Sequence, residues 1–473
     1  MKKLFLIFVN FLIIYFAEAQ TQSDLLQNSI QLIDRGEYEK AISELNKLIN
    51  QNSKTPEAYY QRGRCHLYLN KLKDAGKDLD KAIELNVSQA YFYNLRGVVY
   101  ENEGDTISAV KKYDKAILTD SNDIRAYVSL ARIWEAQGKL KAALNLINKA
   151  IPKAKKDLSP YISKGGLLQL MHDTAEAVQA YRGALKTDSN YFQAHYALSL
   201  IYADKDENKV ALYHIRRAIQ SDPANSDAYV ERGRIYENLN DSISALQSYN
   251  KAIELEPTNT FAYFSRGNYF KTYGNSTAAI NDFTKILQID AGDADALLLR
   301  GQCYADTNNC QLANSDYEAA KKIAPGDPEI YFHIGLCQDE TRYYREAIET
   351  FNLAIKLDSS NSNYYYSRGN SKYNLELLED AKKDYLKALS VDSTNAVPYF
   401  NIGNIHFDKK EYEEAKKYYD KYLKLVPKDA DAMVNRGICN NALGNEKEAC
   451  EEWQKAANLG NFDAKENIKK FCK

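Results

Sequence analysis

Residues 362–395 read SNYYYSRGNSKYNLELLEDAKKDYLKALSVDSTN, and this 34-residue stretch contains the pattern that decides the fold. Ala381 belongs to a series of thirteen alanines that stand 34 residues apart without one insertion or deletion. The series is Ala41, Ala75, Ala109, Ala143, Ala177, Ala211, Ala245, Ala279, Ala313, Ala347, Ala381, Ala415 and Ala449. A fixed period of this length is typical of a solenoid, in which each unit buries its apolar face by stacking on the next.

Other residues keep fixed distances from each alanine. Tyr385 follows Ala381 by four residues and Ala388 follows by seven, which places all three on one helical face. Twelve residues before the alanine, ten of the thirteen repeats have glycine, as at Gly369. We expect small residues at matched heights on neighbouring helices to let the backbones approach closely. Four residues ahead of the glycine position most repeats have tyrosine, as at Tyr365, on the same face of the earlier helix.

Turn-forming residues separate the helical stretches. Gly104, Gly138 and Gly274 lie between the two helices of a repeat, where a residue that tolerates a left-handed conformation ends the first helix. Asn225 and Asn259 lie at the repeat boundary, where a side-chain oxygen can cap the next first helix. The period therefore predicts two helices in each 34-residue unit.

A 34-residue helix-turn-helix with these positions resembles the tetratricopeptide repeat, and the match extends over residues 22–463. The resemblance implies an all-α, right-handed superhelical solenoid of thirteen repeats, whose first helices line a concave groove that binds partners. We expect one continuous solenoid over residues 20–463, with repeats that start at 22, 56, 90, 124, 158, 192, 226, 260, 294, 328, 362, 396 and 430, and a capping helix over 464–473.

Departures from the family pattern occur late in the chain. The aromatic residue expected on the first helix is replaced by Gln338, Lys372, His406 and Asn440 in the last four repeats. We expect these repeats either to pack differently at this position or to bring it toward solvent.

The first nineteen residues fall outside the period. Lys2 and Lys3 precede an apolar run over residues 4–16, and residues 17–19 read Ala-Glu-Ala. This order predicts a secretory signal peptide, cleaved after Ala19, and an exported protein that is periplasmic, surface-associated or secreted, most simply in a bacterium. The apolar run is shorter than the roughly 20 residues that span a bilayer, so no integral membrane segment is expected after cleavage.

The charge balance argues against two classes of partner. The chain has 62 basic and 64 acidic residues, and without residues 1–19 the balance is 60 against 63. A nearly neutral chain gives no electrostatic case for nucleic acid or for an anionic membrane.

Seven cysteines in an exported chain leave at least one unpaired thiol or an intermolecular bond. Cys65, Cys303, Cys337 and Cys439 share one repeat position, which favours a role as small buried apolar residues. We expect a disulfide between Cys450, on the last second helix, and Cys472, in the terminal segment, because it would fix the cap.

The sequence contains no constellation typical of catalysis. HExxH, GxGxxG and GxSxG are absent, and every residue from 22 to 463 belongs to a two-helix unit without an inserted loop. We therefore expect no enzyme activity, no metal and no cofactor. Asp105-Thr106-Ile107 and its equivalents at 173–175 and 241–243 leave two interpretations open: sites of O-glycosylation, or caps of the second helices.

The candidate binding groove follows from the family register. Positions one residue after the packing tyrosine, and four residues beyond, pair Phe264 with Asn268, Phe332 with Leu336, Tyr366 with Asn370 and Phe400 with Asn404. Aromatic area and amide groups suit an extended peptide or a docked helix. Alternatively, the rings pack between adjacent first helices and the asparagines only solvate the groove. Acidic residues one turn further on, such as Asp306, Asp339 and Asp408, favour a ligand with some positive charge.

These features predict a non-catalytic scaffold of the cell envelope that binds a peptide or protein partner in the groove. The alternative is a protein that binds cell-wall glycan by stacking the groove aromatics on sugars. The same solenoid serves many assemblies, so the sequence does not identify the partner.

Overall fold

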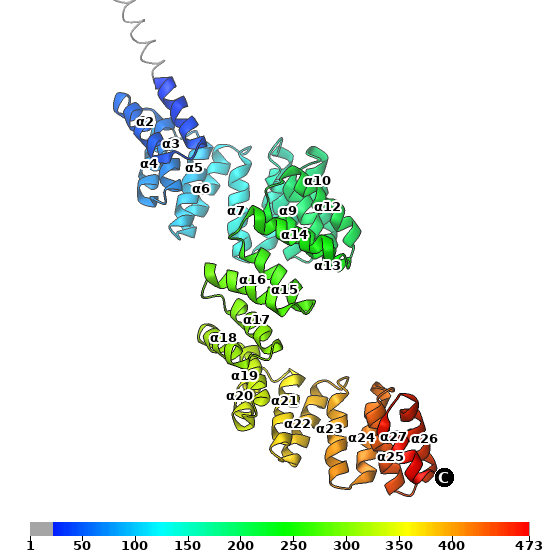
Figure 1. Ribbon diagram of the computed structural model, residues 1–473. Helices are drawn as coiled ribbons and strands as arrows, with labels where there is room; N and C mark the ends of the chain where they lie inside the picture. The colour runs from blue at the N-terminus through cyan, green and yellow to red at the C-terminus, as the bar shows by residue number, and fades with distance from the viewer. Residues whose placement is uncertain (1–21, 473) are drawn as a thin grey trace, which may run out of the picture. The chain divides into compact units, whose positions relative to one another are not determined.

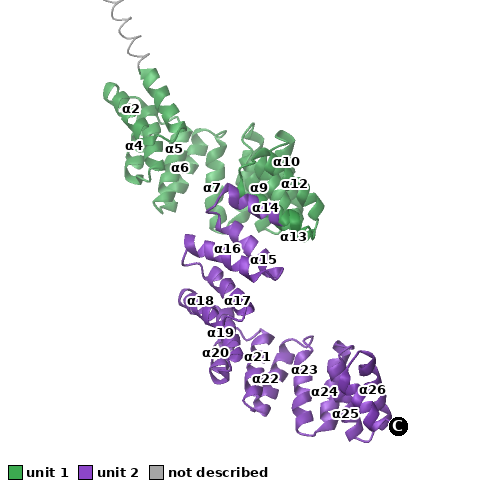
Figure 2. Cartoon of the chain, in the orientation of Figure 1, with its two compact units in different colours: residues 1–245 green, residues 246–473 purple. Residues whose placement is uncertain are grey.

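The computed structural model describes residues 22–472, and the regular structure within this range is entirely helical (Figure 1). The chain forms two compact units, residues 1–245 and residues 246–473 (Figure 2). The chain passes from one unit to the other inside the continuous helix α14 (Ser242–Leu255). The predicted signal peptide, residues 1–19, lies outside the described residues.

The first unit begins with a helix over residues 22–34, and its further helices alternate as first and second helices of the repeats. They are α2 (Tyr38–Gln51), α3 (Pro56–Tyr68), α4 (Leu72–Leu85), α5 (Ala90–Asn102), α6 (Thr106–Thr119), α7 (Ile124–Ala136), α8 (Leu140–Ala150), α9 (Ser159–Leu170), α10 (Thr174–Thr187), α11 (Phe192–Asp204), α12 (Asn208–Ser221) and α13 (Ser226–Asn238). A 3-10 turn over Ile151–Lys153 follows α8, where Pro152 interrupts the helix.

The second unit continues the alternation to the end of the chain. Its helices are α15 (Thr260–Thr272), α16 (Ser276–Ile289), α17 (Ala294–Asp306), α18 (Cys310–Ile323), α19 (Pro328–Glu340), α20 (Tyr344–Leu357), α21 (Ser362–Asn374), α22 (Leu378–Val391), α23 (Val397–Asp408), α24 (Tyr412–Leu425), α25 (Ala430–Ala442), α26 (Glu446–Asn458) and α27 (Phe462–Phe471). The helices α9 and α23 begin one residue later than the period predicts, and α27, the predicted cap, begins two residues earlier.

Turns and caps form where the sequence predicts them. Gly104, Gly138 and Gly274 have positive φ, as do non-glycine residues at the same position, such as Asn240. The side chains of Asn225 and Asn259 accept hydrogen bonds from the backbone N–H groups three residues later and cap α13 and α15. Asp105 caps α6 in the same way.

The core repeats with the same period. All thirteen alanines of the series have 0% of their surface exposed. The large residue four positions later is also buried, as at Tyr317, Phe351 and Trp453. Burial of one small and one large apolar residue at the same place in every unit gives each repeat the same inter-helix distance.

The repeated glycine has a more specific role than the sequence indicates. We expected it to face a second small residue, whereas a large side chain of the second helix covers it, which is Leu79 at Gly63 and an aromatic ring in the other repeats described. A Cβ added at Gly335 would lie 2.6 Å from the Phe351 ring, and one at Gly403 would lie 2.7 Å from the Tyr419 ring. The glycine is therefore needed because the ring, rather than the alanine, occupies the space above it.

Successive first helices contact one another within each unit. In the first unit α3 contacts α5, α5 contacts α7, and α11 contacts α13; in the second unit α17 contacts α19, and α19 contacts α21. Each first helix also packs along the second helix of its own repeat. We call the surface of the first helices that faces away from the second helices the first-helix face.

The polar replacements in the late repeats remain inside this packing. Lys372 Nζ lies 2.7 Å from Asp384 Oδ2, and the His406 ring stacks on Tyr418 with its centroid 5.5 Å away. Asn440 is buried. We expected these positions either to pack differently or to face solvent. Lys372, His406 and Asn440 pack differently.

Candidate functional site

The predicted groove aromatics lie on the first-helix face of the second unit and are only partly exposed. Phe264 is on α15, Phe332 on α19, Tyr366 on α21 and Phe400 on α23. Each ring packs against the buried aromatic of its own second helix at centroid distances of 5.8–6.3 Å. Phe332 also lies 5.0 Å from Tyr364 of the next first helix. The rings therefore contribute to the core and leave only part of their surface for a partner.

The asparagines of the same register are fixed by the second helices. Asn370 Oδ1 accepts a hydrogen bond from the Tyr385 hydroxyl at 2.9 Å, and Asn404 Oδ1 accepts one from the Tyr419 hydroxyl at 2.7 Å. Asn401 Nδ2 of the next first helix donates to Asn370 Oδ1 at 3.3 Å. Within residues 22–472 the Nδ2 groups of Asn370 and Asn404 have no hydrogen-bond partner, so these amides present donors rather than acceptors.

The desolvated environment of the two tyrosines supports this arrangement. Burial raises the pKa of both Tyr385 and Tyr419, so each hydroxyl stays protonated and donates a hydrogen bond to the asparagine oxygen. Asn268, at the same position on α15, is partly exposed, and its second helix has Phe283, which lacks a hydroxyl.

A small pocket adjoins Phe264. It has a volume of about 290 Å³ and is lined by Thr260, Phe261, Ile286, Asp293 and Asp295 as well as by Phe264. Phe261 has 54% of its surface exposed. An apolar floor with two nearby carboxylates suits an aliphatic or aromatic side chain with a basic neighbour.

A chain of polar side chains runs across three first helices, and the sequence did not identify it. Lys271 Nζ of α15 donates to Gln302 Oε1 of α17, and Gln302 Nε2 lies 2.8 Å from His333 Nε2 of α19. Each residue of this chain of side chains is 31 positions from the next in the sequence, and each lies on the next first helix. Burial, and then the charge of Lys271, lowers the pKa of His333 to about 4. His333 is therefore neutral near pH 7 and accepts the Gln302 N–H.

These residues border a pocket of about 300 Å³, which Tyr317, Leu336, Cys337 and Glu340 also line. Residues 34 apart share a repeat position, whereas Lys271, Gln302 and His333 are 31 apart and so lie at different repeat positions. A spacing of 31 residues is the signal in the sequence that places Lys271, Gln302 and His333 together, because it joins side chains on adjacent first helices.

The first-helix face of the first unit is more charged. Arg132, whose side chain is 64% exposed, donates to Glu101 at 3.0 Å across neighbouring first helices. Both residues line a pocket of about 330 Å³. Arg234 donates to Glu231 at 2.9 Å. Arg132 and Arg234 are thus paired with carboxylates, whereas Asn370 and Asn404 of the second unit offer neutral amide donors.

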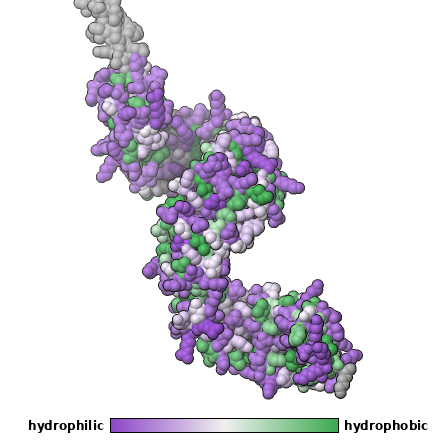
Figure 3. Space-filling view, viewed as in Figure 1, coloured by the Kyte–Doolittle hydropathy of each residue, from purple (hydrophilic) through white to green (hydrophobic). Residues whose placement is uncertain are grey.

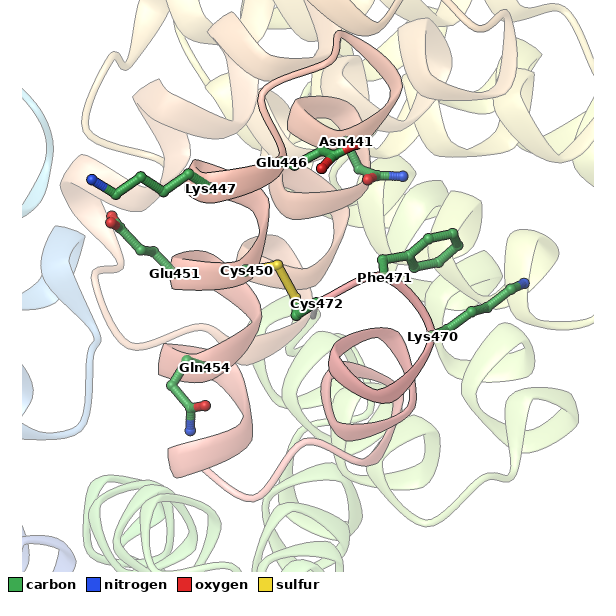
Figure 4. Close-up of a pocket in the computed structure, with 9 residues that line it drawn as sticks. All are labelled: Asn441, Glu446, Lys447, Cys450, Glu451, Gln454, Lys470, Phe471 and Cys472. Carbon is green, nitrogen blue, oxygen red and sulfur yellow. A yellow bond between two sulfur atoms is a disulfide. The ribbon is translucent and has the colours of Figure 1, made fainter.

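The C-terminal end carries the predicted cysteine pair. A disulfide joins Cys450 of α26 to Cys472, which follows α27, with a Cα–Cα distance of 5.8 Å (Figure 4). It borders a pocket of about 730 Å³ that Glu446, Lys447 and Phe471 also line. The other five cysteines, Cys65, Cys303, Cys310, Cys337 and Cys439, are buried thiols.

The surface hydropathy, the possible metal ligands and the helix lengths indicate whether the described residues meet the requirements of other kinds of site. On the visible face, hydrophobic residues are scattered among hydrophilic ones (Figure 3). Among residues 22–472, no three His, Cys, Asp or Glu side chains are placed to hold a metal ion. No helix of that range is long and apolar enough to cross a membrane.

Family models match most of the array. Tetratricopeptide repeat models match residues 56–86, 226–259, 328–361, 362–395 and 396–429, and further ones match 171–226 and 264–328. A TPR repeat model matches residues 31–67. Together the matches extend over more than half of the chain. None of the curated proteins matches it.

Three solved structures are similar at low sequence identity. The anaphase-promoting complex hetero-tetramer Cut9-Hcn1 has 15% identity and a TM-score of 0.43, covering 96% of this chain and 90% of that one. Yeast Tom70 has 17% identity and a TM-score of 0.41, covering 91% and 97%. MamA has 25% identity and a TM-score of 0.32, covering 35% and 96%. On the evidence of its family-model matches and its paired helices, the chain belongs to the tetratricopeptide repeat family.

Proposed function

We propose that the protein is a non-catalytic scaffold of the cell envelope that binds a peptide or protein partner on the first-helix face of its second unit. Tetratricopeptide repeats are protein–protein interaction modules, which supports the general class. The observation that carries the proposal is the fixed orientation of the asparagine amides. Asn370 and Asn404 are held by tyrosine hydroxyls through their oxygens, so both keep N–H donors for a ligand.

A peptide backbone is the ligand that these donors fit best. Its carbonyl oxygens recur along an extended chain or line the end of a docked helix, and each can accept an amide N–H. The hydrogen bonds to the asparagine oxygens already restrict these side chains. Binding therefore costs less conformational entropy. The partly exposed rings of Tyr366 and Phe400 on the same helices supply apolar contact.

The packing of the rings favours a protein partner over glycan. Sugar binding by stacking needs the flat face of an aromatic ring to be free, but Phe332, Tyr366 and Phe400 pack against rings of the second helices. Asp339 and Asp408 accept hydrogen bonds from Ser371 and Tyr373 of neighbouring repeats. Their charge still favours a partner with basic residues.

The location in the envelope is part of the proposal and rests on residues 1–19 of the sequence. N-terminal mass analysis of protein from its native host tests it directly. A mature chain that begins at Gln20 in an envelope fraction supports export. A chain that retains Lys2 and Lys3 in the cytosolic fraction contradicts export and leaves the binding proposal standing.

Substitution of one amide tests the binding surface. Asn404→Asp keeps the acceptor oxygen for Tyr419 and removes the N–H donors, so the fold is maintained while the contact to a ligand is lost. Crosslinking pull-downs from envelope extract should recover a partner with the unaltered protein and much less of it with Asn404→Asp. Phe400→Ala combined with Asn404→Ala should abolish recovery.

Gln288→Glu is the matched control. Gln288 is exposed on the second helix α16, its oxygen accepts from Lys285, and the substitution adds the same charge away from the first-helix face. Recovery of the partner should be unchanged by it. Equal recovery with Asn404→Asp, with helix content and thermal midpoint intact, would exclude this face as the binding site. Binding to purified glycans without any protein partner would support the alternative function.

A further inference from the structure

We infer that Cys310 and Cys337 form a second disulfide, which joins the start of α18 to α19 of the next repeat. Their Sγ atoms lie 2.7 Å apart and both belong to one buried cluster. Sulfur atoms that are not bonded repel strongly at this separation, whereas a disulfide bond is about 2.05 Å long. A small movement of two side chains therefore converts a strained contact into a bond.

The repeat register explains why these two cysteines meet. Cys310 is the first residue of a second helix, and Cys337 lies 27 residues later on the following first helix. The equivalent pairs elsewhere share apolar clusters, namely Leu72 with Val99 and Leu378 with Ile405. The fold thus holds these two positions together in other repeats, and in this repeat both are cysteine.

The other buried cysteines lack such a partner. Cys65, Cys303 and Cys439 occupy the same first-helix position as Cys337, but the residues 27 positions earlier are Tyr38, Ser276 and Tyr412. The register therefore predicts that these three remain thiols. Cys303 is an internal control, because it occupies the same repeat position as Cys337 but has serine 27 residues earlier.

The surroundings provide a route for oxidation by a disulfide oxidant, R–S–S–R. Cys337 lines the pocket of about 300 Å³ on the first-helix face, so its thiolate attacks the oxidant, forming a mixed disulfide and releasing RS⁻, which takes a proton from water. Glu340 Oε2 lies 3.2 Å from Cys310 Sγ and accepts its proton. The Cys310 thiolate then attacks the Cys337 sulfur and releases the second RS⁻, which takes up the proton that Glu340 accepted. The two cysteines lose two protons and two electrons, and the oxidant becomes two thiols.

Burial governs the rate of this reaction. The desolvated site raises the pKa of both thiols, which lowers the fraction of thiolate. The bond should therefore form slowly in the folded protein, over hours rather than seconds, and should be equally slow to be reduced.

Counting and mapping of thiols tests the inference. The purified protein is treated with oxidised glutathione, denatured without reductant and alkylated. Three of the seven cysteines should react, namely Cys65, Cys303 and Cys439. Trypsin should release residues 301–321 linked to residues 323–342, and further cleavage before Asp306 should place the link on Cys310 rather than Cys303.

Three outcomes would overturn the inference. Five reactive cysteines, with Cys310 and Cys337 both alkylated, would show that only the Cys450–Cys472 bond forms. A link from Cys303 would show that the register does not select the pair. A Cys310→Ser variant in which Cys337 still becomes linked to another cysteine of the chain would show that Cys310 is not its partner. The first two outcomes are measured on the unaltered protein, so they do not depend on whether a variant folds.

Discussion

The guanidinium of Arg300 donates two parallel hydrogen bonds, of 2.8 and 2.7 Å, to the carboxylate of Asp316, which lies sixteen residues later on the second helix of the same repeat. The same guanidinium donates to Thr284, sixteen residues earlier, at 3.1 Å. Arg62, Arg266 and Arg368 repeat the geometry with Asp78, Asp282 and Asp384. Each of these arginines thus connects the second helices of two adjacent repeats, which gives it a structural role in the array.

Loss of one such arginine should weaken the array locally. Arg300→Ala leaves the carboxylate of Asp316, whose side chain is 8% exposed, without its partner, and breaking a buried pair costs about 3 kcal/mol. Hydrogen exchange in α17 and α18 should accelerate more than elsewhere. The double variant Arg300→Met with Asp316→Leu should recover most of the loss, because no unpaired charge remains. Equal destabilisation by the single and double variants would contradict this explanation.

Two adjacent glycines in α9 should respond in opposite ways to alanine. At Gly165 an added Cβ would overlap the ring of Tyr181, whereas at Gly166 nothing lies within 4 Å. Gly165→Ala should cost about 1–3 kcal/mol through overpacking. Gly166→Ala should stabilise by up to about 1 kcal/mol through helix propensity. Thermal denaturation of both variants measures the difference, and a shift of the same sign in both would refute the role assigned to the ring.

Acid should destabilise the first unit through two histidines. His195 Nε2 donates to the Ser189 carbonyl at 3.0 Å, so its Nδ1 is the acceptor for His214 Nδ1–H at 2.9 Å. Burial, and then the positive charges of His195 and Arg182, lowers the pKa of His214 to about 4. Burial also lowers the pKa of His195.

The sign of the pH effect follows from proton uptake. Between pH 6.5 and about 4 the unfolded chain binds a proton at His214 that the folded chain does not, so stability falls as the pH falls through this window. The thermal midpoint should therefore drop more steeply in the unaltered protein than in His214→Gln, whose amide does not titrate. Identical slopes between pH 7 and pH 4 would show that the pair does not control acid stability.

Removal of the Cys450–Cys472 disulfide should loosen the C-terminal cap. The bond closes a loop with a sequence separation of 22, for which the chain-entropy model gives about 3 kcal/mol. Cys450→Ser with Cys472→Ser should speed hydrogen exchange in α27. It should also change the fluorescence of Trp453, which is fully buried and lies 5.7 Å from the Phe471 ring. Unchanged exchange in α27 would indicate that apolar packing alone holds the cap.

The repeating part of the fold could be predicted from the sequence because it is local. Ala381, Tyr385 and Gly369 recur at fixed spacing, and each helix packs mainly on the helices next to it in the chain. Similarly, Asn225 caps the helix that begins directly after it. The helices α9 and α23, in which proline is the second residue, begin one residue later than the period predicts, and the terminal helix α27 begins two residues earlier.

The candidate site was predicted less completely. The sequence correctly placed Phe400 and Asn404 on a first helix, but it did not show that the Asn404 oxygen is used by Tyr419 or that the Phe400 ring packs on the same tyrosine. It also missed the row of Lys271, Gln302 and His333. These interactions depend on side-chain direction across two or three helices, which the 34-residue period does not specify.

The sequence by itself therefore determined the repeat, its helices, its caps and the burial of its alanines, because these depend on residues that are near in the chain and occur in every unit. Only the tertiary structure decided which hydrogen-bond donors remain for a partner and that Cys310 lies against Cys337. Those outcomes depend on where adjacent helices bring individual side chains together, and a single substitution, such as cysteine at position 310, changes the chemistry without changing the period.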